Sequence, residues 1–447
     1  MRTNNKLTLA DLTKFMMILG WLTLPLSHLR WLPEFGTTRP LSAILFTLAF
    51  ILIFLTEVIR KGVRLSSLTG WEFVNEHLRR LPGWQFLRWW GVLICLGVLS
   101  VVITPFYGST LQALNRLLGY VLIFIFIYSA LYSLQSYGIE AVAHWVSIGY
   151  VPVLLYAVIE AIATQNVSWA YQVILHIRDW LIVPFNWVGR TALLATEPSF
   201  VSFQILLLIT IFPFLRNKFL RLTNLSLVLI SVLFSKSGMV FVLLLAYLVF
   251  WALFSISSKT LLRSVAAVGA IAIVASVVIR SSLWARSMFI NAIEALLSSQ
   301  RMSDMLISAT IRVSYIVNLI YVLVETRGLG LGIGQYGLFW KQIYLRYINY
   351  KSFDAYGEVS NALASTNYMR PYSVVFGMGS DLGIIGLILF FTFIYQVFRC
   401  CQTAHAKATL IAGFIALLGA YPIVTPHVWL ALALMGGYGL QSKLKQA

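Results

Sequence analysis

The side chains best suited to chemistry lie in the stretch G-R-T-A-L-L-A-T-E-P-S-F-V-S, residues 189–202. This stretch places one cation, Arg190, and one anion, Glu197, just before Pro198 and a long apolar run. Proline is favoured in the first turn of a helix, so a helix is expected to begin there. Because an ionisable residue at the edge of a membrane segment is costly to keep, we interpret Arg190 and Glu197 as candidate site residues.

A second group of charged and aromatic residues lies in the long segment 281–371. Its cations are Arg286, Arg301, Arg312, Arg327, Lys341, Arg346, Lys351 and Arg370, with tyrosines and Trp340 interleaved. Guanidinium groups bind phosphate and diphosphate through paired hydrogen bonds, and aromatic faces suit the CH groups of sugar rings. The combination predicts a site for a diphosphate-linked sugar. A solvated loop with scattered surface arginines is the alternative.

Three shorter motifs add to this pattern. The turn S-K-S-G at 235–238 carries Lys236, which could neutralise a phosphate or extend from the helix end towards water. The run G-L-G-L-G-I-G at 328–334 follows Arg327 but lacks the strand and lysine of a nucleotide loop, so we expect close backbone approach there. Asp381 opens a glycine-rich helix and is expected to form a structural charge pair.

Motifs for nucleotide or metal chemistry are missing from the sequence. It has no P-loop, no H-E-x-x-H and no CxxC, and its six histidines are scattered. The three cysteines, Cys95, Cys400 and Cys401, form neither a disulfide framework nor a zinc-binding spacing. We therefore expect no metal and no cofactor.

The composition indicates that these residues are surrounded by a membrane. The chain of 447 residues is 60% hydrophobic and 11% charged, with a mean hydropathy of +0.84. Ordinary soluble domains carry about 25% charged residues. Repeated apolar runs near the length of a bilayer span then predict an all-α polytopic membrane protein.

About 12 transmembrane helices are expected. Their ranges are 14–30, 41–59, 86–105, 118–135, 140–163, 199–215, 222–235, 238–256, 263–280, 372–398, 406–421 and 427–440. An N-terminal bundle would occupy residues 1–280, a large outer loop with amphipathic helices 281–371, and the last helices 372–447.

The net charge of +18 is interpreted as a topological signal rather than as a nucleic-acid signal. Lys and Arg accumulate in short cytoplasmic loops. With the N-terminus inside, most short basic segments fall on the cytoplasmic side, so both termini are expected there and segment 281–371 outside. Residues 307–324 are apolar, but Arg312 would cost about 2.5–3.5 kcal/mol at the centre of a span. We expect an outer helix at the membrane surface, with a span as the alternative.

The order of these motifs resembles the superfamily of O-antigen polymerases and O-antigen ligases, which includes Wzy-type bacterial polysaccharide polymerases. The resemblance rests on R-T-A-L-L-A-T-E-P-S-F (190–200), F-S-K-S-G (234–238), the large loop with Arg312 and its glycine run, and S-D-L-G-I-I-G-L (380–387). In layout it covers roughly residues 100–400. It implies a GT-C-like fold with one large periplasmic or extracellular loop.

The resemblance also implies a site and a reaction. Members act on undecaprenyl-diphosphate-linked glycans at the outer face of the inner membrane, without a metal, through arginines of two outer loops. Those arginines correspond to Arg190 and Arg312, with Glu197 in the E-P-S motif. Lys236 and Arg327 are expected to bind substrate.

One departure distinguishes the branches of the superfamily. Ligases typically carry a His-Asn pair late in the large loop, where this chain has S-T-N-Y-M-R-P-Y at 365–372 and no histidine. This favours a polymerase over a ligase and leaves the catalytic base unassigned. Asn367, Tyr368 and Arg370 of this stretch are expected to bind substrate.

The sequence thus predicts a metal-independent membrane glycosyltransferase that polymerises lipid-linked oligosaccharide repeats into O-antigen, capsule or exopolysaccharide. Glu197 would either deprotonate the acceptor hydroxyl or hold an arginine in place. We favour the second role because neighbouring cations lower the pKa of a carboxylate. Membrane lipid and a chain-length regulator protein are the other expected partners. An O-antigen ligase, a flippase or transporter, and a structural assembly partner remain the alternatives.

Overall fold

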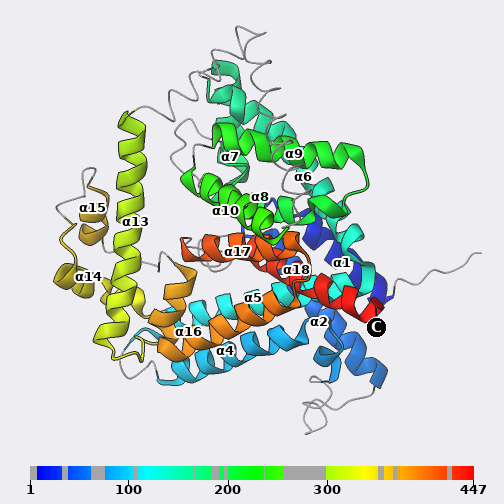
Figure 1. The fold of residues 1–447 in the computed structure, drawn as a ribbon, viewed down its shortest axis with the longest axis horizontal. Coiled ribbons are helices and arrows are strands. Elements are labelled where there is room, and N and C mark those ends of the chain that lie inside the picture. The colour runs from blue at the N-terminus through cyan, green and yellow to red at the C-terminus, as the bar shows by residue number, and fades with distance from the viewer. Residues whose placement is uncertain are drawn as a thin grey trace, which may run out of the picture.

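In a computed structural model, the chain is almost entirely helical, and its described part contains no β-strand beyond two isolated bridges. The structure describes residues 8–32, 39–61, 76–103, 108–165, 167–182, 191–195, 200–235, 237–255, 299–350, 357–365, 371, 373–419 and 425–446. Figure 1 shows a bundle of helices with one long helix standing at its end.

Five described helices are long and apolar enough to cross a membrane. They are α2 (Leu41–Lys61), α4 (Trp84–Ile103), α5 (Thr110–Tyr137), α6 (Ile139–Ala163) and α16 (Val374–Cys400). Shorter apolar helices are α8 (Val201–Ile211), which continues into η3 (Phe212–Phe214), α10 (Gly238–Phe254) and α17 (Ala404–Leu418). The architecture is that of an all-α protein suited to a membrane.

The first helix differs from the expected span at 14–30. Helix α1 runs from Leu9 to Leu22 and begins at a capping box, in which Thr8 and Asp11 each bond the other's backbone N–H. It ends before Pro25, since the proline ring disfavours helix in the preceding residue. With 14 residues, α1 is shorter than a full membrane span.

Two helices expected to be short are longer in the structure. Helix α9 (Lys218–Phe234) replaces the expected 222–235, and α18 (Pro426–Gln446) replaces 427–440. Asn217 caps α9, because its side chain accepts hydrogen bonds from the N–H groups of Phe219 and Leu220. The span expected at 263–280 lies outside the described residues.

The core lies where α4, α5, α16 and α18 pack together. Trp90 of α4 is fully buried there and donates from Nε1 to the Tyr120 carbonyl at 2.9 Å. Its ring lies 4.8 Å from Trp429 and 5.3 Å from Phe393, between ring centroids. Aromatic pairs of this kind add about 0.5–1.5 kcal/mol beyond their buried area.

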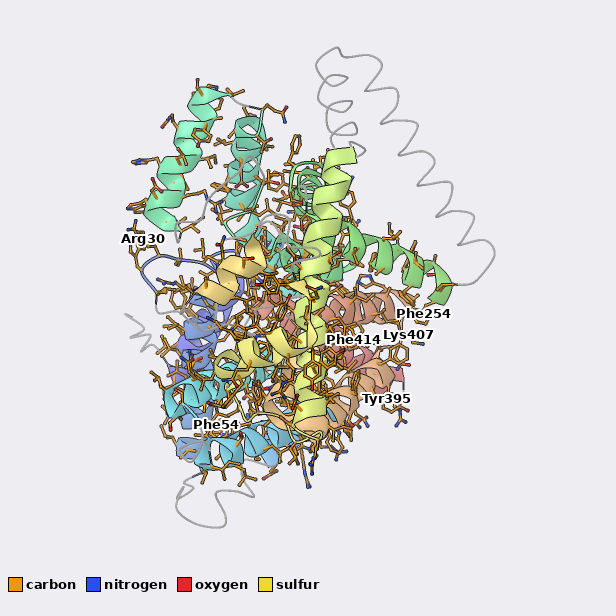
Figure 2. All side chains as sticks on the ribbon, turned by 90° about the vertical axis from the view of Figure 1, so that its left-hand side faces the viewer. Arg30, Phe54, Phe254, Tyr395, Lys407 and Phe414 are labelled. Atoms are coloured by element: carbon orange, nitrogen blue, oxygen red, sulfur yellow. The ribbon has the colours of Figure 1, made fainter. Side chains whose placement is uncertain are left out.

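A lysine contacts two aromatic rings at the end of α10. Figure 2 shows Lys407 of α17 beside Phe254 of α10, with the ammonium 5.6 Å from the ring centroid. Lys407 lies 5.8 Å from the Phe398 ring as well. An ammonium above an aromatic face is attracted by the ring quadrupole, so this lysine joins α10, α16 and α17.

Helices α13 (Ser299–Glu325), α14 (Tyr336–Tyr347) and α15 (Glu358–Ala364) form a separate small core. Ser314 and Asn318 of α13 bond the hydroxyls of Tyr344 and Tyr336 at 2.7 and 3.0 Å, and these hydrogen bonds join α13 to α14. In Figure 1, α13 runs across the ends of α4, α5 and α16 rather than beside them. Residues 307–324 thus lie in a helix that is not among the five able to cross a membrane.

Candidate functional site

Most of the predicted site residues lie outside the described residues. They are Arg190, Glu197, Lys236, Asn367, Tyr368 and Arg370. The structure describes Arg312 and Arg327 directly, and it describes the segments that flank the others. These flanking segments are held by two buried polar networks.

The segment 191–195, between Arg190 and Glu197, is buried and tightly folded. Leu193 and Leu194 both have left-handed backbones, with φ of 48° and 66°. The Ala195 N–H donates to the Ala192 carbonyl at 2.7 Å and closes the turn. Left-handed residues other than glycine cost free energy and persist only when their surroundings hold them.

Glu160 of α6 binds the backbone of this segment. Its Oε2 accepts hydrogen bonds from the N–H groups of Ala192 at 2.8 Å and Leu193 at 3.2 Å. Its Oε1 lies 3.3 Å from Arg178 Nη1 and accepts from the Tyr156 hydroxyl at 3.3 Å. The side chain of Glu160 is fully buried, so each of these donors contributes to satisfying its charge.

Arg178 completes this network from α7 (Ser168–Leu181). Ala170, Ile174 and Arg178 follow one another at four-residue spacing and form the buried face of that helix. The guanidinium reaches past Glu160, and its Nη2 donates to the Ala195 carbonyl at 3.3 Å. Glu160 and Arg178 together therefore bond both ends of the segment 191–195.

The turn that carries Lys236 lies against the same segment. The Thr191 N–H donates to the Phe234 carbonyl at 3.0 Å, at the end of α9. Gln204 of α8 donates from Nε2 to the Leu193 carbonyl at 3.3 Å. Two stretches singled out in the sequence, 190–200 and 234–238, thus meet through their flanking backbone.

A buried histidine lies next to this network. The ring of His28 stacks on Phe200, with 5.6 Å between centroids. His28 is buried, and His427 and Arg178 lie near it.

The second network centres on Asp381 of α16. Its Oδ2 accepts from Arg116 Nε at 2.7 Å and from the Tyr120 hydroxyl at 2.9 Å. Its Oδ1 accepts from the Gly334 N–H at 3.1 Å. The predicted structural charge pair of Asp381 is confirmed, with Arg116 of α5 as the partner.

The glycine run 328–334 approaches α16 closely, as predicted. The Leu331 N–H donates to the Ser380 carbonyl at 2.7 Å, and the Ile384 N–H donates to the Gly328 carbonyl at 2.8 Å. Gly383 has φ of 67° inside α16 and kinks the helix. A Cβ at Gly383 would lie 2.3 Å from the Gly328 oxygen, so only glycine allows this contact.

Gln335 fixes the same linker to the start of α5. Its side-chain amide donates to the Ser109 carbonyl at 3.0 Å and accepts from the Ser109 N–H at 2.8 Å. The Ile333 N–H donates to Ser100 of α4 at 2.8 Å. The linker between α13 and α14 is thereby bonded to three helices of the bundle.

Arg312 lies on α13, partly buried, and pairs with no carboxylate in the described part of the chain. It is eleven residues, or about three turns, before Leu323, so the two side chains share a helix face. Leu323 faces α16, because a Cβ at Gly379 would lie 3.2 Å from it. Arg312 is thus directed to the bundle side of α13.

Arg327 lies just beyond the C-terminal end of α13, exposed and with φ of 52°. Helix geometry separates Arg312 from the end of α13 by about 20 Å. The two predicted site residues are thus held at different heights along α13.

The late part of the large loop is tied to α14. Lys341 of α14 donates from Nζ to the carbonyl of Ser365, which directly precedes the stretch of Asn367, Tyr368 and Arg370. Arg116 borders the other end of that stretch, because a Cβ at Gly377 would lie 3.0 Å from Pro371 and 3.1 Å from Arg116.

Within the described ranges, no group of three or more His, Cys, Asp or Glu side chains is placed to hold a metal ion. Comparison of the chain with protein-family models and with curated proteins finds no match. We therefore infer a function from the residues of this chain and from the resemblance of their motifs.

Sequence reasoning missed the pairing of Glu160 with Arg178. Glu160 lies within an apolar run and Arg178 within a more polar stretch, but they are separated by 18 residues and lie on different helices. The available signal was that an ionisable group inside a membrane helix requires a partner. Arg116, which pairs with Asp381 over 265 residues, carried no signal of its own.

Proposed function

We propose that this protein is a membrane glycosyltransferase that polymerises undecaprenyl-diphosphate-linked oligosaccharide repeats. In this proposal the chain crosses the bacterial inner membrane about 12 times. Both termini face the cytoplasm, and α13, α14 and α15 belong to a large loop at the outer face. The product would be an O-antigen, a capsule or an exopolysaccharide.

The observation that carries this proposal is the fixed segment 191–195. It separates two residues of opposite charge, Arg190 and Glu197, and it is bonded on both sides by Glu160 and Arg178. Two adjacent left-handed leucines are costly, and such strain concentrates at functional sites. A segment held in this way supports a role in positioning its flanking charged residues.

In the proposed reaction, a sugar hydroxyl of one lipid-linked repeat attacks the anomeric carbon of the nascent chain. A new glycosidic C–O bond forms as the bond from the anomeric carbon to the lipid diphosphate breaks. The hydroxyl proton passes to a base that we do not assign, and the leaving diphosphate takes the bonding electron pair. Arg190 and Arg312 would stabilise the charge on that leaving group, an electrostatic effect that often dominates catalysis.

Glu197 and the remaining predicted residues have supporting roles in this proposal. Glu197 would hold an arginine in place, since a carboxylate beside cations is a weak base. Lys236 would contact the diphosphate. Arg327 would bind substrate from the C-terminal end of α13.

The decisive experiment compares glycan length in cells with and without the gene, complemented by variants. Loss of long chains, with single repeats still reaching their final acceptor, is the expected result. Arg312→Lys should abolish long chains at a normal protein level, whereas Arg346→Lys, at an exposed arginine of α14, should retain them. Full activity of the Arg312→Lys protein would contradict the assignment.

The same experiment separates the alternatives. Long chains that stay on the lipid carrier would indicate an O-antigen ligase. Repeats trapped on the cytoplasmic face would indicate a flippase, and a normal glycan after replacement of both Arg190 and Arg312 would favour a structural assembly partner.

A further inference from the structure

The segment 191–195 is bonded by side chains from two helices that lie outside the predicted catalytic stretch. Glu160 binds the N–H groups of Ala192 and Leu193, and Arg178 binds the carbonyl of Ala195. The two side chains also pair with each other at 3.3 Å. The contacts to the backbone and the contact between the charges can be separated by mutation.

A simple ion pair would not require this geometry. Glu160 Oε2 has no bond to Arg178 in the structure and is directed to the two amides, while Oε1 takes the guanidinium and Tyr156. The shortest of these hydrogen bonds, at 2.8 Å, is the one from Ala192. One oxygen of the carboxylate thus binds the arginine, and the other binds the strained backbone.

We propose that Glu160 and Arg178 are positioning residues that hold the segment 191–195, and thereby Arg190 and Glu197, in the arrangement that catalysis needs. This inference rests on the proposed function. It assigns a role to two residues of α6 and α7 that the motif resemblance does not include. Neither residue is proposed to touch the substrate.

The test uses two double variants that share Arg178→Met and differ only in the substitution at Glu160. Glu160→Met with Arg178→Met removes both charges and the acceptor. Glu160→Gln with Arg178→Met removes both charges but keeps a side-chain carbonyl for the amides of Ala192 and Leu193. Replacing a buried ion pair by apolar residues of similar volume is often tolerated, so the Met/Met protein is expected to fold.

Hydrogen–deuterium exchange of the purified full chain gives a readout that does not depend on activity. Peptides covering 191–195 should exchange about tenfold to a hundredfold faster in the Met/Met variant than in wild type, since hydrogen bonds to a charged group are lost. The Gln/Met variant should show an intermediate rate. The exposed pair Glu140–Arg216, changed to Met in both positions, is the control and should leave these peptides unchanged.

Glycan length in complemented cells completes the test. At equal protein levels, the Met/Met variant should lose long chains and the Gln/Met variant should recover part of them. A purely structural charge pair would make the two variants equal, which would overturn the proposal. Unchanged exchange in the Met/Met variant, or fast exchange with normal glycan, would overturn it as well.

Failure of the proposed function would look different. If cells without the gene make normal glycan, or if Arg190→Lys and Arg312→Lys retain long chains, the glycosyltransferase assignment is wrong whatever the exchange rates show. If those variants are inactive while the Met/Met variant is active, the glycosyltransferase assignment is retained and only the positioning role of Glu160 and Arg178 is wrong.

Discussion

Two buried carboxylates, Glu160 and Asp381, each pair with one arginine and each bond the backbone of a connecting segment. The segments they hold differ in residue type. Glu160 holds left-handed leucines, whereas Asp381 holds a run in which Gly328, Gly330, Gly332 and Gly334 supply the positive φ values. Glycine adopts these angles without steric cost, and leucine does not.

The difference indicates what each network contributes. The backbone of the glycine run is unstrained, because glycine adopts positive φ without steric cost. Hydrogen bonds are sufficient to fix this run as the connection between α13, α14 and α16. The segment 191–195 is strained, so its conformation depends on Glu160 and Arg178. We therefore expect the first network to affect how the outer helices are attached, and the second to affect the candidate site directly.

The largest effect is expected from Arg178→Met alone. It leaves the Glu160 carboxylate buried without its cation, and breaking a buried pair in this way costs about 3–5 kcal/mol. Arg116→Met should cost less, because the Arg116 side chain is 13% exposed and that of Arg178 only 5%. Thermal unfolding of the detergent-purified proteins measures both. Equal losses of stability in the two variants would contradict the expected difference between the Glu160 and Asp381 networks.

Gly383→Ala should disrupt the Asp381 region without changing any charge. A side chain at φ of 67° and ψ of −160° is strained by about 1–3 kcal/mol, and the new Cβ would clash with the Gly328 carbonyl. Gly91→Ala is the matched control, since its Cβ would meet no atom within 4 Å other than those of its chain neighbours and its own helix backbone. The measurements are the unfolding temperature and proteolysis between α13 and α14. A stable, protease-resistant Gly383→Ala protein would contradict the close contact.

Asp381→Asn tests the charge in the same network. The amide can still accept from Gly334, but its NH2 group opposes Arg116, so we expect a loss of about 1.5–3 kcal/mol. Glycan length should respond less than to the Glu160→Met and Arg178→Met double change at a similar loss of stability. A larger glycan defect for Asp381→Asn would reverse the assignment of the two networks.

The smallest effect is expected at Glu325, on the surface between α13 and α14. Hydrogen bonds from Tyr347 and then Arg346 hold the pKa of Glu325 below its usual 4.5. The folded state therefore binds the proton less readily than the unfolded state, and the stability contribution present above pH 4.5 is lost as pH falls through the lower folded pKa. Glu325→Gln should remove this slight acid dependence from the unfolding midpoint. An unchanged acid slope would assign the dependence to other carboxylates.

Much of the helical architecture followed from the sequence. Apolar runs predicted helices at each described position where one was expected, because burial of apolar surface in a membrane leaves a strong one-dimensional signal. The end of α1 at Leu22 was mispredicted, since hydropathy continues through Pro25 although the helix does not. The glycine run and Asp381 were interpreted correctly, because glycine and a lone carboxylate each have few structural uses.

Candidate site chemistry was visible in the sequence only as types of residue. Arg190, Glu197 and Arg312 stood out because charge is rare in this chain, and their proposed roles remain predictions. Tertiary structure alone decided which charges pair: Glu160 with Arg178 and Asp381 with Arg116. These pairs join residues on separate helices, and neither periodicity nor local spacing encodes such contacts. The sequence determined which residues could not be left unpaired in an apolar interior, and the packing of the helices determined their partners.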